Sequence, residues 1–109
     1  MKKIPASFFP GMEDGTSELV CPACGENYLH QRSVAVWDRG EDSAITRETT
    51  VSLAVSTMMA ASEDCANPST RRQGLSIMFE CETCLEENKD HELCFAQHKG
   101  VTVVFWRVP

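Results

Sequence analysis

Hydrophobic and β-branched residues recur at every second position in parts of the chain, which is the period of a β-strand with one buried face. The alternation is clearest in residues 50–59, TVSLAVSTMM, where it runs from Val51 to Met59. It also occurs in residues 74–80, GLSIMFE, directly before a cysteine. Residues 28–37 end in β-branched and aromatic residues, and residues 92–98 and 101–108 are interpreted as two strands around a short turn. Together these segments predict strands over residues 28–37, 50–59, 74–80, 92–98 and 101–108.

The segments between these strands have the composition of loops and turns. Residues 38–49 and 60–73 are polar, and the second contains the turn-initiating pair Asn67-Pro68. Lys99-Gly100 has the length of a two-residue hairpin turn, since Gly tolerates positive φ. Residues 82–92 have room for one or two helical turns. The pattern therefore predicts a mainly β domain with little helix and an antiparallel sheet of about four to five strands.

The first twenty residues differ in composition from the rest. Residues 1–20 are rich in Pro, Gly, Ser and acidic side chains, with Phe8 and Phe9 as isolated apolar positions. We interpret them as an N-terminal arm before a β domain over 21–109, which is one domain by length. The start resembles a signal peptide but lacks an apolar core, and no stretch has the roughly 18 apolar residues of a membrane span. We expect a cytoplasmic protein.

Four of the six cysteines form two C-x-x-C pairs, in CPACG (residues 21–25) and in CETC (residues 81–84). A C-x-x-C turn places two sulfurs on the same side of a tight loop, and two such turns supply the four ligands of a tetrahedral metal ion. In the first turn, Pro22 restricts the backbone and Gly25 lets the chain curl past the second sulfur. We predict one structural Zn²⁺, held by Cys21, Cys24, Cys81 and Cys84.

Other uses of these cysteines are open at this stage. Two C-x-x-C pairs in a reducing compartment indicate metal or redox chemistry, whereas six cysteines in a secreted chain would indicate disulfides. A redox pair needs a helix N-terminus within a βαβ pattern, which is not found here. Buried reduced thiols and disulfides are further alternatives, and four thiolates do not decide between zinc and iron. We interpret Cys65 as a free loop thiol and Cys94 as a small core residue.

The two cysteine turns resemble the knuckles of the zinc-ribbon class. Because 56 residues separate the turns, the resemblance implies an expanded ribbon rather than a minimal three-stranded one. The stretches NPSTRRQGLSIMFECETC and QHKGVTVVFW also resemble a group of small uncharacterised phage and prophage proteins. That second resemblance implies no particular activity.

The charge pattern bears on the kind of partner. The formal charge is −6, and four thiolates with one divalent ion would make it −8. This opposes general attraction to phosphate backbones but allows a local basic patch. Arg71 and Arg72 in one loop, with His98 and Lys99 in the last turn, are our candidate partner-binding residues. Acidic residues instead crowd the second cysteine turn: Glu80, Glu82, Glu86, Glu87, Asp90 and Glu92.

The candidate chemistry favours binding over catalysis. A closed four-thiolate site leaves no open coordination position for a substrate, and no Ser/His/Asp order or phosphate-binding glycine loop is found. We therefore expect a small zinc-stabilised adaptor, not an enzyme. Its expected partner is a protein, with nucleic acid as the second candidate and no membrane contact. The alternative is a phage-type accessory or inhibitor protein that acts on a host factor through its acidic surface.

Overall fold

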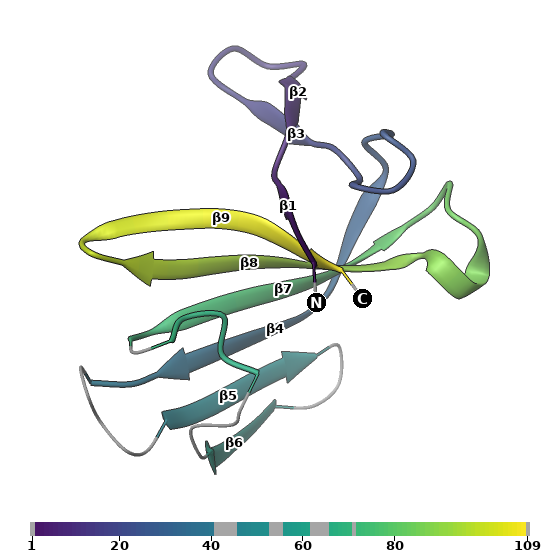
Figure 1. Ribbon diagram of the computed structural model, residues 1–109. Helices are drawn as coiled ribbons and strands as arrows, with labels where there is room; N and C mark the ends of the chain where they lie inside the picture. Colours follow the sequence, from purple (N-terminus) through teal and green to yellow (C-terminus); the bar gives the residue numbers. More distant parts are fainter. Residues whose placement is uncertain (1, 41–45, 53–55, 62–65, 71, 109) are drawn as a thin grey trace.

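The computed structural model describes residues 2–40, 46–52, 56–61, 66–70 and 72–108. Within these residues, seven strands form one antiparallel sheet in the order β1-β9-β8-β7-β4-β5-β6, and two more form a separate hairpin (Figure 1). The mainly β, antiparallel architecture predicted from the sequence is therefore confirmed. The strands are β1 (Lys2–Pro5), β2 (Phe8–Pro10), β3 (Ser17–Leu19), β4 (Leu29–Asp38), β5 (Thr46–Ser52), β6 (Ser56–Ala61), β7 (Gly74–Cys81), β8 (Asp90–His98) and β9 (Val101–Val108).

Strands β7, β8 and β9 carry the hydrophobic core on both faces of the sheet. On one face, Phe79, Leu93 and Trp106 form a buried cluster in which Leu93 stands opposite Trp106. The rings of Phe79 and Trp106 meet edge to face at 5.8 Å, an arrangement worth about 0.5–1.5 kcal/mol beyond its buried area. The other face buries a second cluster of Cys94, Ala96 and Phe105.

Residues 66–70 and 72–73 fold against the sheet. The Ser69 hydroxyl donates to the carbonyl of Gln73 and accepts from the backbone N–H of Gln97 at 3.0 Å. The Arg107 guanidinium donates to the carbonyl of Ala66 at 2.7 Å. The Ser69 contact lies near the end of β8, whereas Arg107 stands opposite Glu92 near its start, so the loop before β7 is held along β8.

The prediction of one strand over residues 50–59 is wrong. Residues from this stretch belong to two antiparallel strands, β5 and β6, which pair with each other. Strand β5 begins at Thr46, inside the predicted loop 38–49. The stretch VSLAVSTMMAA, residues 51–61, contains no Gly, Pro, Asn or Asp that would mark the turn between them. Its alternation therefore imitates a single longer strand.

The N-terminal residues contribute more regular structure than expected. Strand β1 pairs along β9, with Lys2 opposite Val108 and Pro5 opposite Phe105. Residues 8–19 then form the β2–β3 hairpin, which projects from the sheet (Figure 1). Their short length and two prolines conceal these strands from a periodicity argument. The main sheet thus has seven strands, two or three more than predicted.

Several local predictions are confirmed. The turn between β8 and β9 consists of Lys99 and Gly100, with φ angles of 50° and 80°, as a two-residue hairpin turn requires. Helical structure in the described chain amounts to one 3-10 turn, η1 (Glu86–Asn88), so none of its helices has the length and hydrophobicity needed to cross a membrane.

Candidate metal centre

The first cysteine turn is closed by its own backbone. The N–H of Cys21 donates to the carbonyl of Glu26 at 2.7 Å, and the N–H of Gly25 donates back to the carbonyl of Cys21 at 3.1 Å. Gly25 has φ of +80°, a conformation that side chains disfavour, which explains the glycine of CPACG. The turn also points the N–H of Ala23 at the Cys21 sulfur, 3.4 Å away.

The register of the sheet brings the second turn to the first. Strand β4, which follows the first turn, pairs with β7 so that Leu29 stands opposite Cys81. The N–H of Glu82 then donates to the carbonyl of Tyr28 at 3.0 Å, and that of Cys81 donates to the carbonyl of Lys89 at 2.9 Å. Two turns far apart in sequence therefore meet at one end of the sheet.

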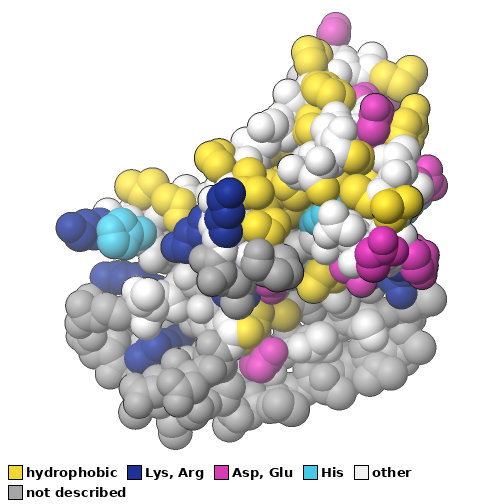
Figure 2. Space-filling view, turned by 45° about the vertical axis from the view of Figure 1, so that its right-hand side comes forward, with side chains coloured by type: hydrophobic (Ala, Val, Ile, Leu, Met, Phe, Trp, Pro, Cys, Tyr) yellow, Lys and Arg dark blue, Asp and Glu magenta, His cyan; other side chains and the backbone are white. Residues whose placement is uncertain are grey.

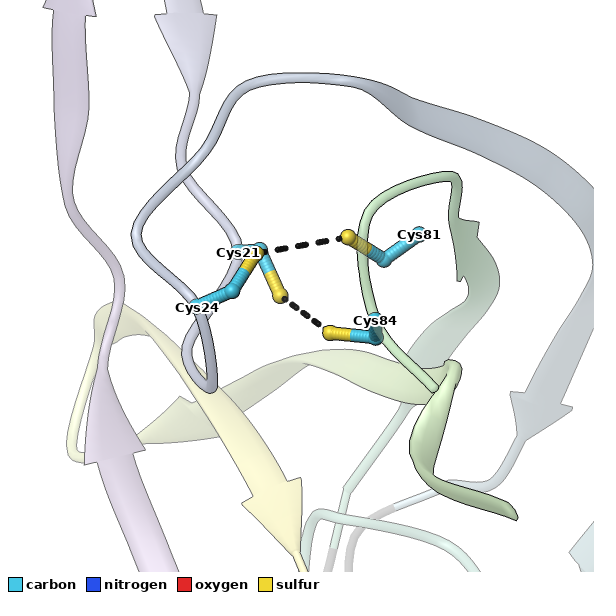
Figure 3. Close-up of side chains that lie close together, drawn as sticks. All are labelled: Cys21, Cys24, Cys81 and Cys84. Carbon is cyan, nitrogen blue, oxygen red and sulfur yellow. Dashed lines mark hydrogen bonds between the residues drawn. The ribbon is translucent and has the colours of Figure 1, made fainter. Parts of the chain in front are cut away.

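The four sulfurs of these turns form one compact group. The Sγ atoms of Cys21, Cys24, Cys81 and Cys84 all lie within 4.8 Å of one another. Across the two turns, Cys21 and Cys84 are 3.6 Å apart and Cys24 and Cys81 are 3.5 Å apart (Figure 3). A tetrahedron with metal–sulfur distances near 2.3 Å has edges of about 3.8 Å. The group therefore has the size that one tetrahedral ion requires.

The distances also distinguish a metal site from disulfides. A disulfide joins two sulfurs at about 2.05 Å, well below the separations across the turns. Cys21 and Cys81 are buried, Cys84 is half-buried and Cys24 is exposed, so the site lies at the surface. The residues present fit a structural metal ion. They do not specify which ion it is.

The acidity of the thiols reflects their crowding. Burial raises the pKa of Cys21, and burial together with the neighbouring sulfurs raises that of Cys84. Burial also acts to raise the pKa of Cys81, but hydrogen bonds from Thr83, Cys24 and Cys84 outweigh it and lower the value to about 6. Four such sulfurs cannot all ionise this close together without a cation among them.

Two side chains that the sequence reasoning did not select lie against the sulfurs. The Thr83 hydroxyl lies 3.0 Å from the Cys24 sulfur and 3.2 Å from that of Cys81. The imidazole Nε2 of buried His91 lies 3.6 Å from the Cys84 sulfur, and its ring meets Trp106 edge to face at 6.2 Å. Thr83 occupies a variable position of its C-x-x-C, and the sheet register alone brings His91 to the turn. Local sequence therefore signals neither contact.

The candidate partner-binding residues lie at the opposite end of the sheet. His98 and Lys99 are exposed at the β8–β9 turn, and Arg72 is exposed in the loop before β7. Arg72 lines a shallow pocket of about 240 Å³ with Arg39, Gln73 and Gln97. The structure thus brings three of the four predicted residues to one end, while Arg71 lies outside the described residues. We call Arg39, Arg72, His98 and Lys99 the basic end.

The acidic side chains of the second turn remain near the metal centre. Glu80 forms ion pairs with Arg32 and Lys89, and Glu82 pairs with His30. Figure 2 shows most Lys, Arg and His side chains toward one end of this face and most Asp and Glu side chains toward the other end and on the projecting part. Among the described residues, basic and acidic side chains therefore gather toward opposite ends of this face.

Of the two remaining cysteines, Cys94 lies in the described part of the chain and stands apart from this centre. Cys94 is fully buried in the second core cluster, and burial raises its pKa to about 11. Its interpretation as a core residue is confirmed. Cys65 lies outside the described residues.

Comparisons with protein-family models, with curated proteins and with solved structures give no match for this chain.

Proposed function

We propose that this protein is a small, non-catalytic binding module of the expanded zinc-ribbon type, stabilised by one Zn²⁺. The observation that carries the proposal is the group of four sulfurs from two distant turns, all within 4.8 Å of one another. Four thiolates complete a tetrahedral sphere and leave no position for a substrate, which is the pattern of structural rather than catalytic zinc. When bound, the ion would supply the cross-link between the two turns.

The surroundings of the sulfurs support this role. The N–H of Ala23, the hydroxyl of Thr83 and the imidazole of His91 can each donate to a thiolate. Such donors offset the net charge of −2 that four thiolates give a Zn²⁺ centre. Native mass spectrometry combined with elemental analysis tests the proposal: we expect one zinc per chain, and a folded protein that contains no metal contradicts it.

We propose the basic end as the contact surface. Among the described residues, its pocket is lined by two arginines and two glutamines. Guanidinium groups recognise carboxylates and phosphates with fixed geometry. The rest of the chain is acidic, so an anionic ligand is directed to this end rather than spread over the surface. A protein partner with acidic side chains is the first candidate and a nucleic acid the second.

Mobility-shift assays test the nucleic-acid branch. The double variant Arg72→Ala/Lys99→Ala removes two cations from the basic end, while Arg32→Ala/Lys89→Ala removes two cations that pair with Glu80 near the metal centre. Binding that falls in the first variant and not in the second supports nucleic acid as the ligand. If wild type itself shifts neither single-stranded nor double-stranded probes at low salt, that branch is excluded and the protein branch stands.

A second candidate function uses the other end of the molecule. Glu82, Glu86 and Glu87 are exposed around the second turn, next to a site that carries negative charge when loaded. This surface is the basis of the alternative that the chain is a phage-type accessory or inhibitor protein directed at a basic host factor. Capture of a defined partner by wild type, lost on Glu82→Lys/Glu87→Lys and kept on Arg72→Ala/Lys99→Ala, would favour it.

A further inference from the structure

The β2–β3 hairpin exposes an unusual amount of apolar surface. Phe8 is 55% exposed, Phe9 43% and Met12 98%. Phe8 and Phe9 are consecutive residues of β2, so their side chains point to opposite faces of the hairpin, while Met12 lies in its loop. Apolar side chains are therefore exposed on both faces and at the tip of one short projection. Figure 1 shows the projecting hairpin, and Figure 2 shows apolar side chains on the projecting part. We call residues 8–19 the finger.

The finger is held in shape by its own bonds. The N–H of Gly11 donates to the carbonyl of Thr16 at 2.9 Å, and the hydroxyl of Thr16 donates to the carbonyl of Glu13 at 2.6 Å. Any side chain on Gly11 would collide with Thr16, so this loop requires glycine there. A preorganised apolar tip loses little conformational entropy when it binds.

The metal centre fixes the base of the finger. The chain passes from Leu19 directly into Cys21, and the amide of Asn27 in the stretch after the first turn donates to the Glu18 carboxylate at 2.6 Å. The N–H of Val20 donates to the carbonyl of Ser7 at 3.0 Å. The direction in which the finger points therefore depends on the cysteine turn.

All charged side chains of the finger are acidic. It contains Glu13, Asp14 and Glu18, and no Lys or Arg occurs between Lys3 and Arg32. A surface that receives it must therefore combine an apolar hollow with positive charge.

A hollow of this kind lies at the other end of the same molecule. A pocket of about 280 Å³ beside the β8–β9 turn has an apolar floor that includes Ala96, Val103 and Phe105. Among the described lining residues, Lys3 and His98 are the charged or titratable ones and none is acidic. Lys99 follows His98 in the adjoining turn. The Lys3 ammonium sits 4.7 Å from the centre of the Phe105 ring. The volume lies just below the range of pockets for drug-sized ligands, and so suits one apolar side chain.

We propose that the finger of one copy docks into this pocket on a second copy, with Met12 as the apolar anchor and Glu13 and Asp14 facing Lys3 and Lys99. The finger points away from its own sheet (Figure 1), so one molecule does not fill its own pocket. Contact between two different surfaces is heterologous, and it extends to further copies or closes into a ring. The inference rests on the proposed function, since it names an acidic protein partner for the basic end.

Sedimentation velocity of the zinc-loaded, reduced protein over a wide range of concentration tests the contact. We expect the mean mass to rise with concentration and the rise to weaken with salt. Met12→Ser should weaken association about tenfold, as loss of a central anchor does. The control Val51→Ser replaces a side chain that is 48% exposed on β5, which three strands separate from β9 in the sheet, and should leave association unchanged.

Charge reversal gives an independent readout. Glu13→Lys/Asp14→Lys reverses the finger, and Lys3→Glu/Lys99→Glu reverses the rim of the pocket. Each variant alone should be monomeric, while an equimolar mixture should associate again because each finger then meets a rim of opposite charge. Failure of the mixture to associate, or a monomeric wild type at every concentration, overturns the inference. Metal content measured on the same samples shows separately whether the proposed function holds.

Discussion

The Sγ atoms of Cys24 and Cys81 lie 3.5 Å apart, although 57 positions separate them in the chain. An ion that bridges them closes a long loop, and it can do so only in the folded state. Removal of the metal by a chelator should therefore destabilise the domain. With free zinc about 100-fold above its dissociation constant, binding adds about 2.7 kcal/mol, which corresponds to a melting-temperature shift of more than about 10 °C.

Two cysteine variants provide the matched comparison for this first prediction. Cys24→Ser removes a ligand at an exposed position and should abolish the zinc-dependent part of the melting temperature. Cys94→Ala removes a thiol from the core and should lower stability with and without zinc, while the zinc-dependent shift is kept. Equal zinc-dependent shifts in wild type and Cys24→Ser would contradict the assignment of the site.

The Thr83 hydroxyl lies within 3.2 Å of sulfurs from both cysteine turns. Hydrogen bonds to metal ligands fix their orientation and reduce their charge, and loss of such a partner typically costs 10–100-fold in metal affinity. Thr83→Val keeps the shape of the side chain but removes the donor. We expect zinc affinity, measured by competition with a chromophoric chelator, to fall by about that factor.

Thr83→Ser is the control for this second prediction, because it keeps the hydroxyl and removes only a methyl group. Its zinc affinity should remain close to that of wild type. Equal affinity for Thr83→Val and wild type would show that the hydroxyl serves the loop rather than the metal.

The metal ligands were predictable because their signal is local. C-x-x-C fixes two sulfurs on one turn whatever the rest of the fold does, so Cys21, Cys24, Cys81 and Cys84 could be selected together. Strand β7 was predictable for a similar reason, since GLSIMFE alternates at period two, and β8 and β9 were predictable as two apolar segments around a Lys-Gly turn. The β8–β9 turn carries its own glycine.

The remaining features depend on tertiary pairing. The contact of His91 with Cys84 follows from β8 starting beside the end of β7, which no short stretch encodes. Strands β1 and β2 are too short for a periodic signal. The sequence between β5 and β6 contains no Gly, Pro, Asn or Asp that would predict a turn. The basic end likewise could not be predicted without the sheet order, because its residues come from three separate segments of the chain.

Gly74 is the first residue of β7, and the preceding loop packs against it. A Cβ atom at this position would lie 2.1 Å from the Asn67 side-chain oxygen and 3.0 Å from the Pro68 ring. Asn67 accepts from the N–H of Ser69 and donates to the carbonyl of Arg72, so displacing it disturbs the whole loop. Gly74→Ala should cost about 1–3 kcal/mol of stability, as overpacking does, and should weaken binding at the basic end.

Chemical denaturation measures this third effect, with Gly100→Ala as the comparison. Gly100 has φ of +80°, but a Cβ atom added there would meet no other atom within 4 Å. Its replacement therefore strains the turn alone, by about 1–2 kcal/mol. The two variants should separate loop packing from backbone strain. A Gly74→Ala protein of wild-type stability would show that the loop does not pack against β7.

Glu92 and Arg107 form a paired contact across β8 and β9. The Arg107 guanidinium donates to both carboxylate oxygens of Glu92, at 2.9 and 3.0 Å, and also donates to the carbonyl of Ala66. Burial acts to raise the pKa of Glu92, but hydrogen bonds from Arg107 and Ser76 outweigh it and lower the pKa below its usual 4.5. Since both side chains are partly exposed, Glu92→Gln should cost only about 1–2 kcal/mol at neutral pH.

The pH dependence of this fourth effect follows from the sign of the shift. A carboxyl group whose native pKa is depressed contributes its full stabilisation above its usual pKa and loses it as the pH falls through the native value. The difference in unfolding free energy between wild type and Glu92→Gln should therefore be constant from about pH 5 to 8 and shrink below about pH 4. Glu82→Gln, in an exposed pair with His30, should change stability little at any of these values. A difference that grows toward low pH would mean that Glu92 is stabilised in its protonated form.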